Sequence, residues 1–479
     1  MSVHGNPVDG QSREHLGNVC VLGIGKTGVV VADYLAGQLG NRVDSVTVYG
    51  GGKSRMGKEA ERLQGRGVRV VVGTEELDGS YDLAVASPGI SEFSAFFASA
   101  REHASEVIGE PEFAWRESPD RWVAITGTNG KTTTTTLTAE LLRADGLSAQ
   151  TVGNIGTVAT GQVGGRGFGT WFVAELSSFQ LATTRRLHPR VACLLNVTPD
   201  HVEWHKTLQN YAAAKEKVFR NLAASDLAVV SDEDEWCRAI IARLEGRGLR
   251  VCHLNVHSDP GTTCAAFARQ GRLVVRLDGV EHELVSVGNL PIKGEHNLQN
   301  ALAASVIALE VGVAEKAVCH GLLSFRALEH RIEPCGEMGG VQFVNDSKAT
   351  NTDAVEKALT AFTPGKVIVL LGGHDKGTDL GSLAHAVAAR CKVAVCYGDA
   401  APRMAKAMED AGADMGLRVL RAPHMAQALD AGIAVAEPGD TVLLSPACSS
   451  FDEFSGFEER GRVFKDLVSS KMLGAGAIR

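Results

Sequence analysis

The chain lacks the features that would place it in a membrane or on a nucleic acid. It has no apolar run approaching the roughly 18 residues that a membrane-spanning helix needs. Its N-terminal stretch, MSVHGNPVDGQSREHLGN, has no apolar core of the kind a signal peptide requires. Basic residues are not in excess, because 48 Lys and Arg stand against 56 Asp and Glu, for a net charge of −8. We therefore expect a cytoplasmic protein with no membrane and no nucleic-acid partner.

Paired cysteines are also lacking. The 10 cysteines are scattered along the sequence, and none of them forms a C-x-x-C pair. In a long cytoplasmic chain such cysteines are usually small buried residues, so we expect neither a disulfide nor a zinc site. Hydrophobic residues make up 44% and charged residues 22%, as in ordinary globular proteins, and 479 residues correspond to about three domains.

Short apolar runs alternate with helical stretches along the sequence, which predicts an α/β fold with parallel sheets. The cluster RESPD at 116–120 is typical of a linker, and we expect domains at 1–116, 117–327 and 328–479. In the second segment we expect a central sheet, an amphipathic helix over 294–312 and a small β appendage. The appendage would be a hairpin at 272–287 that turns near Asp278-Gly279.

The first motif is GIGKTG at 23–28, which follows an apolar strand and precedes a helix. Its glycines let backbone N–H groups approach a diphosphate at the helix N-terminus. A dinucleotide site also needs an acidic residue at the end of the second strand, where this sequence has Tyr49-Gly50-Gly51. NAD is therefore disfavoured, and a site for another diphosphate and a plain tight turn fit about equally.

The second motif is GTNGKTT at 127–133, again between a strand and a helix. It has two residues fewer between its glycines than the usual phosphate-binding loop. The shorter loop can still bind a phosphate, because backbone N–H groups and the helix dipole favour phosphate oxygens. Lys131 could bridge the terminal phosphates, and the Thr132 hydroxyl could reach Mg²⁺. A phosphate site is thus favoured over a chance glycine turn.

Further polar residues follow other predicted strands. Glu175 and His201 lie just beyond apolar runs, and a carboxylate suits Mg²⁺, whereas the Lys215 ammonium would repel it. His205 competes with His201 on spacing alone. The segment NDSKATN at 345–351 has too many polar residues for a mere turn, although a capped helix start could coexist with a site. GGHDK at 372–376 and SPACSSF at 445–451 follow equivalent strands.

Together these motifs resemble the Mur ligase family of ATP-dependent amide-bond-forming enzymes, from about Val21 to Phe464. GTNGKTTT (127–134) and HNLQN (296–300) are similar to the wider family, which includes folylpolyglutamate synthetases. Three segments resemble the branch that adds D-glutamate. They are ELSSFQL (175–181), NDSKATN (345–351) and LSPACSSFDEF (444–454).

The resemblance implies a Rossmann-like N-terminal domain, a central P-loop ATPase-like α/β domain and a Rossmann-like C-terminal domain. These would hold a UDP-sugar, ATP and the incoming amino acid, respectively. The implied reaction adds D-glutamate to UDP-N-acetylmuramoyl-L-alanine through an acyl phosphate, a cytoplasmic step of peptidoglycan precursor synthesis. It would need ATP, two Mg²⁺ ions and a CO₂-derived carbamate on Lys215, which turns a repelling ammonium into an oxygen ligand. We expect a monomer.

The resemblance also assigns roles to residues of this sequence. The catalytic residues would be Lys131, His201, Lys215 and Lys348, and the metal ligands Thr132, Glu175, His201 and Lys215. ATP would contact Gly127, Thr128, Asn129, Gly130, Lys131, Thr132, Thr133, Asn297, Asn300, Arg331 and Asp346. The UDP-sugar would contact Gly25, Lys26, Thr27, Ser87, Gly89 and Asn154, and D-glutamate would contact Thr350, Lys376, Ser450 and Phe457.

One position departs from the family pattern. Members of the family place Asp-Thr-Arg after the second strand for the uridine, where this chain has Tyr49-Gly50-Gly51 with Lys53 and Arg55 beyond. We expect backbone N–H groups of the glycine run and a basic side chain to substitute.

Two other functions compete with this interpretation. Another ligase of the same family, or a folylpolyglutamate-type ligase, shares the GTNGK loop but not NDSKATN with LSPACSS. The protein could also be a regulatory switch that binds ATP and a UDP-sugar as signals. That function would not explain the charged residues in the polar segments at 345–351 and 372–376.

Overall fold

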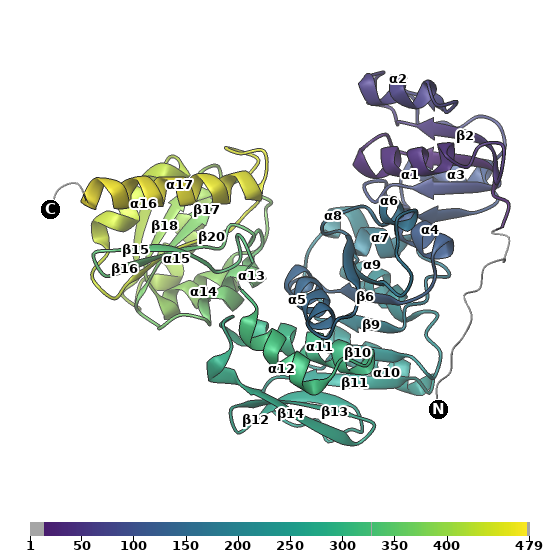
Figure 1. Ribbon diagram of the computed structural model, residues 1–479. Helices are drawn as coiled ribbons and strands as arrows, with labels where there is room; N and C mark the ends of the chain where they lie inside the picture. Colours follow the sequence, from purple (N-terminus) through teal and green to yellow (C-terminus); the bar gives the residue numbers. More distant parts are fainter. Residues whose placement is uncertain (1–13, 327, 477–479) are drawn as a thin grey trace. The chain divides into compact units, whose positions relative to one another are not determined.

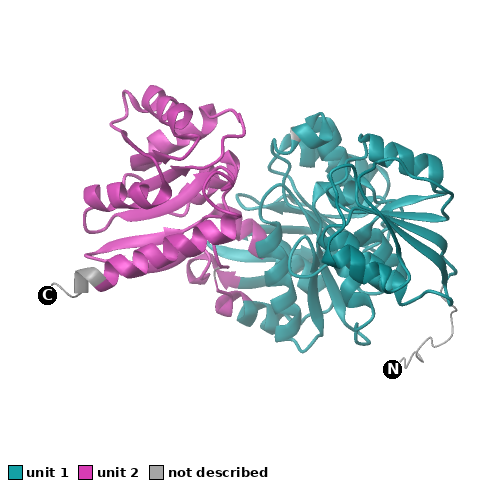
Figure 2. Ribbon diagram, turned by 90° about the horizontal axis from the view of Figure 1, so that it is seen from above, with its two compact units in different colours: residues 1–284, 302–321 teal, residues 285–301, 322–479 magenta. Residues whose placement is uncertain are grey.

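The computed structural model describes residues 14–326 and 328–476, and the chain forms two compact units (Figure 2). Unit 1 comprises residues 1–284 and 302–321, and unit 2 comprises residues 285–301 and 322–479. Unit 1 contains two sheets and unit 2 contains one, all rich in parallel strands and accompanied by helices (Figure 1). The predicted α/β class is therefore confirmed. Within the described ranges, no helix is both long and apolar enough to cross a membrane.

The first sheet of unit 1 has five parallel strands in the order β3-β2-β1-β4-β5. Both of its faces carry buried apolar side chains, as expected for a parallel sheet covered by helices. The strand order reverses direction between β1 and β4, and ligands bind at such a switch point in open α/β sheets. The strands are β1 (Gly17–Leu22), β2 (Val43–Tyr49), β3 (Arg69–Val71), β4 (Leu83–Ala86) and β5 (Val107–Gly109); the helices are α1 (Lys26–Ala36), α2 (Lys58–Gln64), α3 (Ala95–His103) and α4 (Glu110–Glu117).

The second sheet of unit 1 has nine strands in the order β14-β13-β12-β11-β10-β9-β6-β8-β7. Its switch point is β6, which pairs with β8 on one side and β9 on the other. Its strands are β6 (Trp122–Thr126), β7 (Ala149–Gly153), β8 (Trp171–Glu175), β9 (Val191–Leu194), β10 (Leu227–Ser231), β11 (Arg250–Asn255), β12 (Ala265–Arg269), β13 (Arg272–Leu277) and β14 (Val280–Ser286). The segments that follow or connect these strands include α5 (Lys131–Ala144), α6 (Ala159–Val163), α7 (Ser178–Ala182), α8 (Val202–His205), α9 (Leu208–Glu216), η1 (Lys217–Phe219), α10 (Glu235–Gly246), η2 (Val287–Asn289), α11 (Glu295–Glu310) and α12 (Glu315–Ser324).

The predicted hairpin forms, with Asp278 (φ 48°) and Gly279 (φ 83°) in the left-handed conformation that a tight two-residue turn requires. It is not a separate appendage, because β12 to β14 continue the same sheet. The predicted amphipathic helix is α11, but almost all of its side chains beyond its first turn are buried. The helix is therefore confirmed, but its expected polar face was wrong, because the sequence NALAASVIAL after the first turn has no charged residue.

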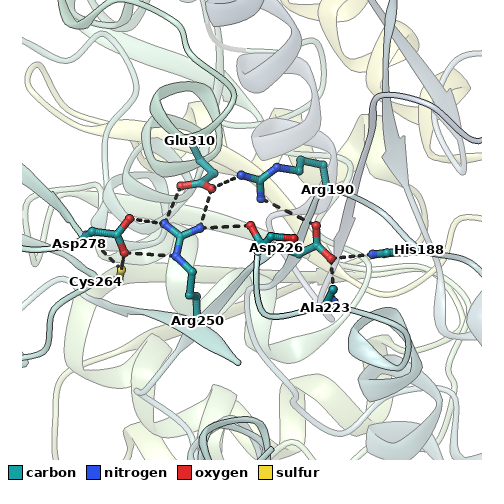
Figure 3. A network of polar contacts seen from close by, with 9 residues as sticks. His188, Arg190, Ala223, Asp226, Arg250, Cys264, Asp278 and Glu310 are labelled. Carbon is teal, nitrogen blue, oxygen red and sulfur yellow. Dashed lines mark hydrogen bonds and ion pairs between the residues drawn. The ribbon is translucent and has the colours of Figure 1, made fainter. Parts of the chain in front are cut away.

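A polar network anchors the C-terminal end of α11 to the nine-stranded sheet (Figure 3). Glu310 accepts hydrogen bonds from Arg190 (2.7 Å) and Arg250 (2.8 Å). Arg250 begins β11 and also binds Asp278 in the hairpin turn at 2.6 Å. One carboxylate thus joins the helix to two parts of the sheet, while His188 binds Asp226 close by at 2.6 Å.

The cluster RESPD is not wholly a linker, because Arg116 and Glu117 form the last turn of α4. Glu117 accepts hydrogen bonds from Tyr34 (2.5 Å) and Arg42 (2.7 Å), which belong to the first-sheet region. Glu110, at the other end of α4, accepts from the backbone N–H of Thr160 at 2.7 Å. Buried carboxylates therefore tie α4 to elements around both sheets of unit 1.

Unit 2 has one sheet of six strands in the order β15-β16-β20-β17-β18-β19, parallel except for the β15–β16 pair. Apolar residues fill both faces of this sheet. The strands are β15 (Glu333–Met338), β16 (Val341–Asn345), β17 (Val367–Gly372), β18 (Cys391–Tyr397), β19 (Arg418–Ala422) and β20 (Thr441–Ala447); the helices are α13 (Thr352–Leu359), α14 (Gly381–Arg390), α15 (Ala401–Gly412), α16 (Met425–Val435) and α17 (Phe457–Gly476).

Candidate active site

The GTNGKTT loop lies at the switch point of the nine-stranded sheet, between β6 and α5. Gly127 (φ 156°) and Gly130 (φ 83°) adopt conformations that favour glycine. A side chain at Gly127 would also approach Leu195 Cβ at 3.0 Å. Gly130 precedes the first residue of α5 and supplies no side-chain cap, so the helix N-terminus is available to an anion.

Two lysines converge on this loop. Lys131 Nζ donates hydrogen bonds to the carbonyl oxygens of Gly127 (2.9 Å) and Thr128 (2.8 Å). Lys215 Nζ, on α9, donates to the same Gly127 oxygen at 2.7 Å. Lys215 is only 1% exposed, and its burial, with the charge of Lys131 second, holds its pKa well below the ordinary value.

Some polar residues of the loop are fixed by hydrogen bonds or burial, and others are partly exposed. The Thr128 hydroxyl is hydrogen-bonded to Tyr211 Oη at 2.9 Å, and the Asn129 backbone N–H donates to Asn196 Oδ1 at 2.8 Å. Thr133 is buried, whereas Thr132 is half-buried. Sequence reasoning missed Asn196 and Tyr211; the one available signal was the position of Tyr211 four residues before Lys215 on the same helix.

Glu175 ends β8, next to β6, and is 2% exposed. Its Oε1 accepts a hydrogen bond of 2.7 Å from Asn154 Nδ2. Its Oε2 is buried and has no hydrogen-bond partner among the described residues. The negative charge of Glu175 also acts on Lys215, where it opposes the lowering of the lysine pKa. The side chains of Glu175 and Lys215, both predicted metal ligands, are therefore close enough to interact electrostatically.

His201 adopts a left-handed backbone conformation (φ 52°), and its side chain is 47% exposed. Its ring lies 4.8 Å from that of Phe179 and 6.4 Å from that of Tyr211, measured between centroids. His205, the alternative on spacing, is buried and shares a 2.9 Å hydrogen bond with Ser178. Burial lowers the pKa of His205 to about 4, so this ring is neutral at physiological pH.

Mg²⁺ usually relies on one or two carboxylates together with substrate phosphates and water, rather than on an all-protein cage. Across residues 14–326 and 328–476, no three His, Cys, Asp or Glu side chains are grouped closely enough to hold a metal ion by themselves. The unpartnered buried oxygen of Glu175 fits a hard cation, because a buried carboxylate oxygen without a donor is costly. The local chemistry therefore suits a magnesium ion that arrives with a phosphate ligand.

Five of the six predicted UDP-sugar residues flank the switch point of the five-stranded sheet. Gly25 precedes α1 without a side-chain cap, and Lys26 and Thr27 form the first turn of that helix. Ser87 and Gly89 follow β4, and Ser87 Oγ is buried without a hydrogen-bond partner among the described residues. Gly28 is required, because a side chain there would lie 1.8 Å from the Gly23 carbonyl oxygen. Asn154 instead follows β7 in the second sheet.

The departure after the second strand is partly closed to a ligand. Tyr49 is buried, and its hydroxyl is bound to Asp78 (2.5 Å) and to Tyr81 (2.8 Å). The Gly50 backbone N–H donates to the Val71 carbonyl at 2.8 Å, so it is not open to a phosphate. Of the groups expected to bind the uridine, the Gly50 N–H is therefore excluded. The backbone N–H groups from Gly51 onward and the basic side chains of Lys53 and Arg55 remain candidates.

In unit 2, the three polar segments follow β16, β20 and β17, which are neighbours in the sheet. Lys348 Nζ lies 3.7 Å from the Phe457 ring centroid, and Lys376 Nζ donates to the Thr350 carbonyl at 3.1 Å. Ser450 follows β20 and is buried. The residues predicted to hold D-glutamate are therefore brought together at one edge of this sheet.

Asp346 is buried directly after β16. It accepts hydrogen bonds from Ser445 Oγ (2.7 Å) and from the Ile332 backbone N–H (3.2 Å). Burial nevertheless dominates and raises the Asp346 pKa to about 7. Arg331 precedes Ile332, and the predicted adenine contacts Asn297 and Asn300 are buried on α11 and joined by a 3.1 Å hydrogen bond.

Sequence reasoning missed Arg460, which is fully buried on α17. Its guanidinium donates to Ser347 Oγ (2.9 Å), the Ser347 carbonyl (2.9 Å) and the Cys448 carbonyl (3.0 Å). Gly373 lies against the same group, since a side chain there would come within 3.1 Å of Nη1. One arginine thus binds two of the three loops by hydrogen bonds and lies against the third, and no local pattern singled it out.

Comparisons with known proteins agree with this architecture. Residues 125–308 match the family model "Mur ligase middle domain", and residues 330–448 match "Mur ligase, glutamate ligase domain". The chain is 37% identical over 455 residues to the UDP-N-acetylmuramoylalanine--D-glutamate ligase of Koribacter versatilis, covering 94% of this chain and 96% of that protein. It is 39% identical over 452 residues to the enzyme of the same name from Solibacter usitatus, covering 94% and 97%.

Two solved structures share the fold at lower identity. The pseudomurein peptide ligase type C of Methanothermus fervidus is 15% identical with a TM-score of 0.58, covering 95% of this chain and 99% of that chain. The UDP-N-acetylmuramate-alanine ligase MurC of Thermotoga maritima is 20% identical with a TM-score of 0.55, with the same two coverages of 95% and 99%. These similarities concern the fold alone.

Proposed function

Because the chain belongs to the Mur ligase family, we propose that it is an ATP-dependent ligase that adds D-glutamate to UDP-N-acetylmuramoyl-L-alanine. The observation that carries this proposal is the convergence of Lys131 and Lys215 on the Gly127 carbonyl, in a glycine loop at a helix N-terminus. The product would be a precursor of peptidoglycan, made in the cytoplasm.

The chemistry follows from the poor reactivity of a carboxylate. The alanyl carboxylate of the sugar substrate attacks the γ-phosphate of ATP, which forms an acyl phosphate and releases ADP. The D-glutamate amine then attacks the acyl carbon, and phosphate leaves from the tetrahedral intermediate. In both steps the protein chiefly neutralises charge and positions the reactants. Lys131 would leave its two carbonyl partners for the phosphate oxygens, which are stronger acceptors.

ATP would be held in unit 1 by residues 127–133, with Lys131 and Thr132 at the terminal phosphates. Thr132, Glu175, His201 and a carbamate on Lys215 would hold two Mg²⁺ ions, which supply charge neutralisation at the phosphates when bound. Asn297, Asn300, Arg331 and Asp346 would contact the nucleoside, with Asp346 at the ribose.

Carbamylation of Lys215 is supported by its environment. The amine must be neutral to attack CO₂, and burial together with the charge of Lys131 favours the neutral amine. Attack of the amine on CO₂ forms a new C–N bond and releases one proton to solvent. The resulting carbamate would place an anion next to Lys131.

The substrates would occupy two further places. Gly25, Lys26, Thr27, Ser87, Gly89 and Asn154 would contact the UDP-sugar, and Thr350, Lys376, Ser450 and Phe457 would contact D-glutamate. Lys348 and Lys376 suit a substrate with two carboxylates, because charge-assisted hydrogen bonds to carboxylates are strong. Lys348 would act at the reacting ends.

The domain boundaries that we propose are 116/117 and 327/328, and each segment contains one of the three sheets. We also propose a cytoplasmic monomer. Sedimentation equilibrium over a wide concentration range tests the oligomeric state. We expect a single species of 50.6 kDa, and a concentration-dependent dimer would contradict the monomer.

The decisive experiment identifies the product by mass spectrometry. UDP-N-acetylmuramoyl-L-alanine, ATP, Mg²⁺ and D-glutamate should yield the amide product with ADP and phosphate in equal amounts. Parallel reactions contain L-alanine, meso-diaminopimelate or L-glutamate in place of D-glutamate. Product with one of these and none with D-glutamate would instead establish another ligase of the family.

A further inference from the structure

Asn154, assigned to the sugar substrate by resemblance, makes its closest contacts with Glu175. The strands β7 and β8 pair so that Gly153 lies opposite Glu175. The Asn154 backbone N–H donates to the Glu175 carbonyl at 2.8 Å, and Asn154 Nδ2 donates to Glu175 Oε1 at 2.7 Å. A single residue therefore binds both the main chain and the side chain of Glu175.

The preceding glycine makes this double contact possible. Gly153 has φ 95°, and a side chain there would lie 2.4 Å from the Glu175 carbonyl oxygen. The loop closes behind it, because the Gly153 N–H donates to the Thr157 carbonyl at 3.0 Å. The sequence VGN at 152–154 thus brings the asparagine amide close to the carboxylate.

The contact has a direct consequence for the two carboxylate oxygens. Oε1 is taken by the amide, whereas Oε2 is buried and unpartnered among the described residues. The amide is neutral, so it fixes the rotation of the carboxylate without cancelling its charge, as an arginine or lysine would. Glu175 is thereby presented with one oxygen, Oε2, that no donor among the described residues occupies.

We infer that Asn154 is a positioning residue that sets Glu175 as a one-oxygen ligand for Mg²⁺, in addition to any contact with the sugar. This inference rests on the proposed function. Outer partners that orient metal ligands typically account for about 10- to 100-fold in metal affinity or activity. Asn154 itself is exposed, so its removal takes away this orientation without opening a cavity in the core.

The test compares full-length wild type with Asn154→Ala, Asn154→Gln and the control Thr157→Ala. Thr157 is exposed on the same loop, and its part in the loop is made by its backbone. Mn²⁺ binding in the presence of a non-hydrolysable ATP analogue is followed by electron paramagnetic resonance. We expect Asn154→Ala to weaken Mn²⁺ binding about 10- to 100-fold, Asn154→Gln to restore part of it, and Thr157→Ala to match wild type.

Michaelis constants separate this role from a contact with substrate. If Asn154→Ala raises only the KM for the UDP-sugar and leaves Mn²⁺ affinity within twofold of wild type, the inference is overturned. If Asn154→Ala does not bind the ATP analogue, Asn154→Gln decides the question. We expect its Mn²⁺ affinity to be lower than that of wild type, and an affinity equal to that of wild type would overturn the inference. Failure of the proposed function is distinct, because wild type itself would then form no amide product.

Discussion

Lys131 and Lys215 donate hydrogen bonds to one carbonyl oxygen, that of Gly127, at 2.9 and 2.7 Å. Two ammonium groups at one acceptor repel each other, and Lys215, the buried partner, is the one whose pKa falls. This arrangement joins the phosphate-binding loop to the lysine proposed to carry the carbamate. Binding of a triphosphate or conversion of Lys215 to an anion would each relieve the repulsion.

Lys215→Ala should lose most ligase activity, because the anionic oxygen of the carbamate is removed. Bicarbonate does not rebuild the missing side chain, but short-chain carboxylic acids should restore part of the activity by supplying a carboxylate in the vacated space. Phosphate release with and without added acetate or propionate measures this. Full activity of Lys215→Ala without any additive would contradict the carbamate role.

Lys131→Met should shift carbamylation of Lys215 to higher pH. Burial remains the main cause of the low Lys215 pKa, but loss of the neighbouring charge raises that pKa, so less neutral amine is present at a given pH. Carbon-13 NMR with labelled bicarbonate, recorded over a pH series, reports the carbamate of each protein. An identical pH dependence in wild type and Lys131→Met would show that the two amines do not interact.

Asp346→Asn should stabilise the protein more at pH 8 than at pH 5. The folded-state pKa of about 7 lies above the ordinary 3.8, so the charged carboxyl disfavours folding as pH rises between these values. That difference corresponds to roughly 4 kcal/mol once the group is fully charged. The loss of one acceptor oxygen in asparagine adds a constant offset at every pH.

Urea unfolding at several pH values measures the Asp346 effect. Exposed Asp410 on α15 provides the matched control, because Asp410→Asn should change stability little at any pH. A stability difference between wild type and Asp346→Asn that is constant from pH 5 to pH 8 would contradict the raised pKa.

Arg460→Met should destabilise unit 2 by about 3 kcal/mol, since it leaves several buried acceptors without their donor. Because Arg460 binds Ser347 and Cys448, the loops that carry Lys348 and Ser450 should loosen. The KM for D-glutamate should therefore rise more than the KM for the UDP-sugar. Thermal unfolding and steady-state kinetics check the two effects, and Arg460→Lys should be intermediate in both.

An unchanged KM for D-glutamate in a folded Arg460→Met protein would separate Arg460 from the amino-acid site. Its contacts would then serve only stability.

The sequence by itself determined the local part of this protein. Apolar runs followed by glycine or polar segments predicted most strands and the loops behind them, because such patterns depend on neighbours along the chain. The conformations of Gly130 and of Asp278-Gly279 follow from the same local chemistry. Several strands escaped this reasoning, among them β3, which has only three residues with partial burial.

Only the tertiary structure decided which loops meet. Strand order places β6 between β8 and β9, and β20 between β16 and β17, so that Glu175 lies near the Gly127 loop and Ser450 near Lys348. Contacts between residues that are tens to hundreds of positions apart in the sequence decide three features. They are the burial of Lys215, the hydrogen bonds of Asn154 to Glu175 and the contacts of Arg460. Local propensity cannot specify such contacts, because they arise from the packing of whole sheets and helices.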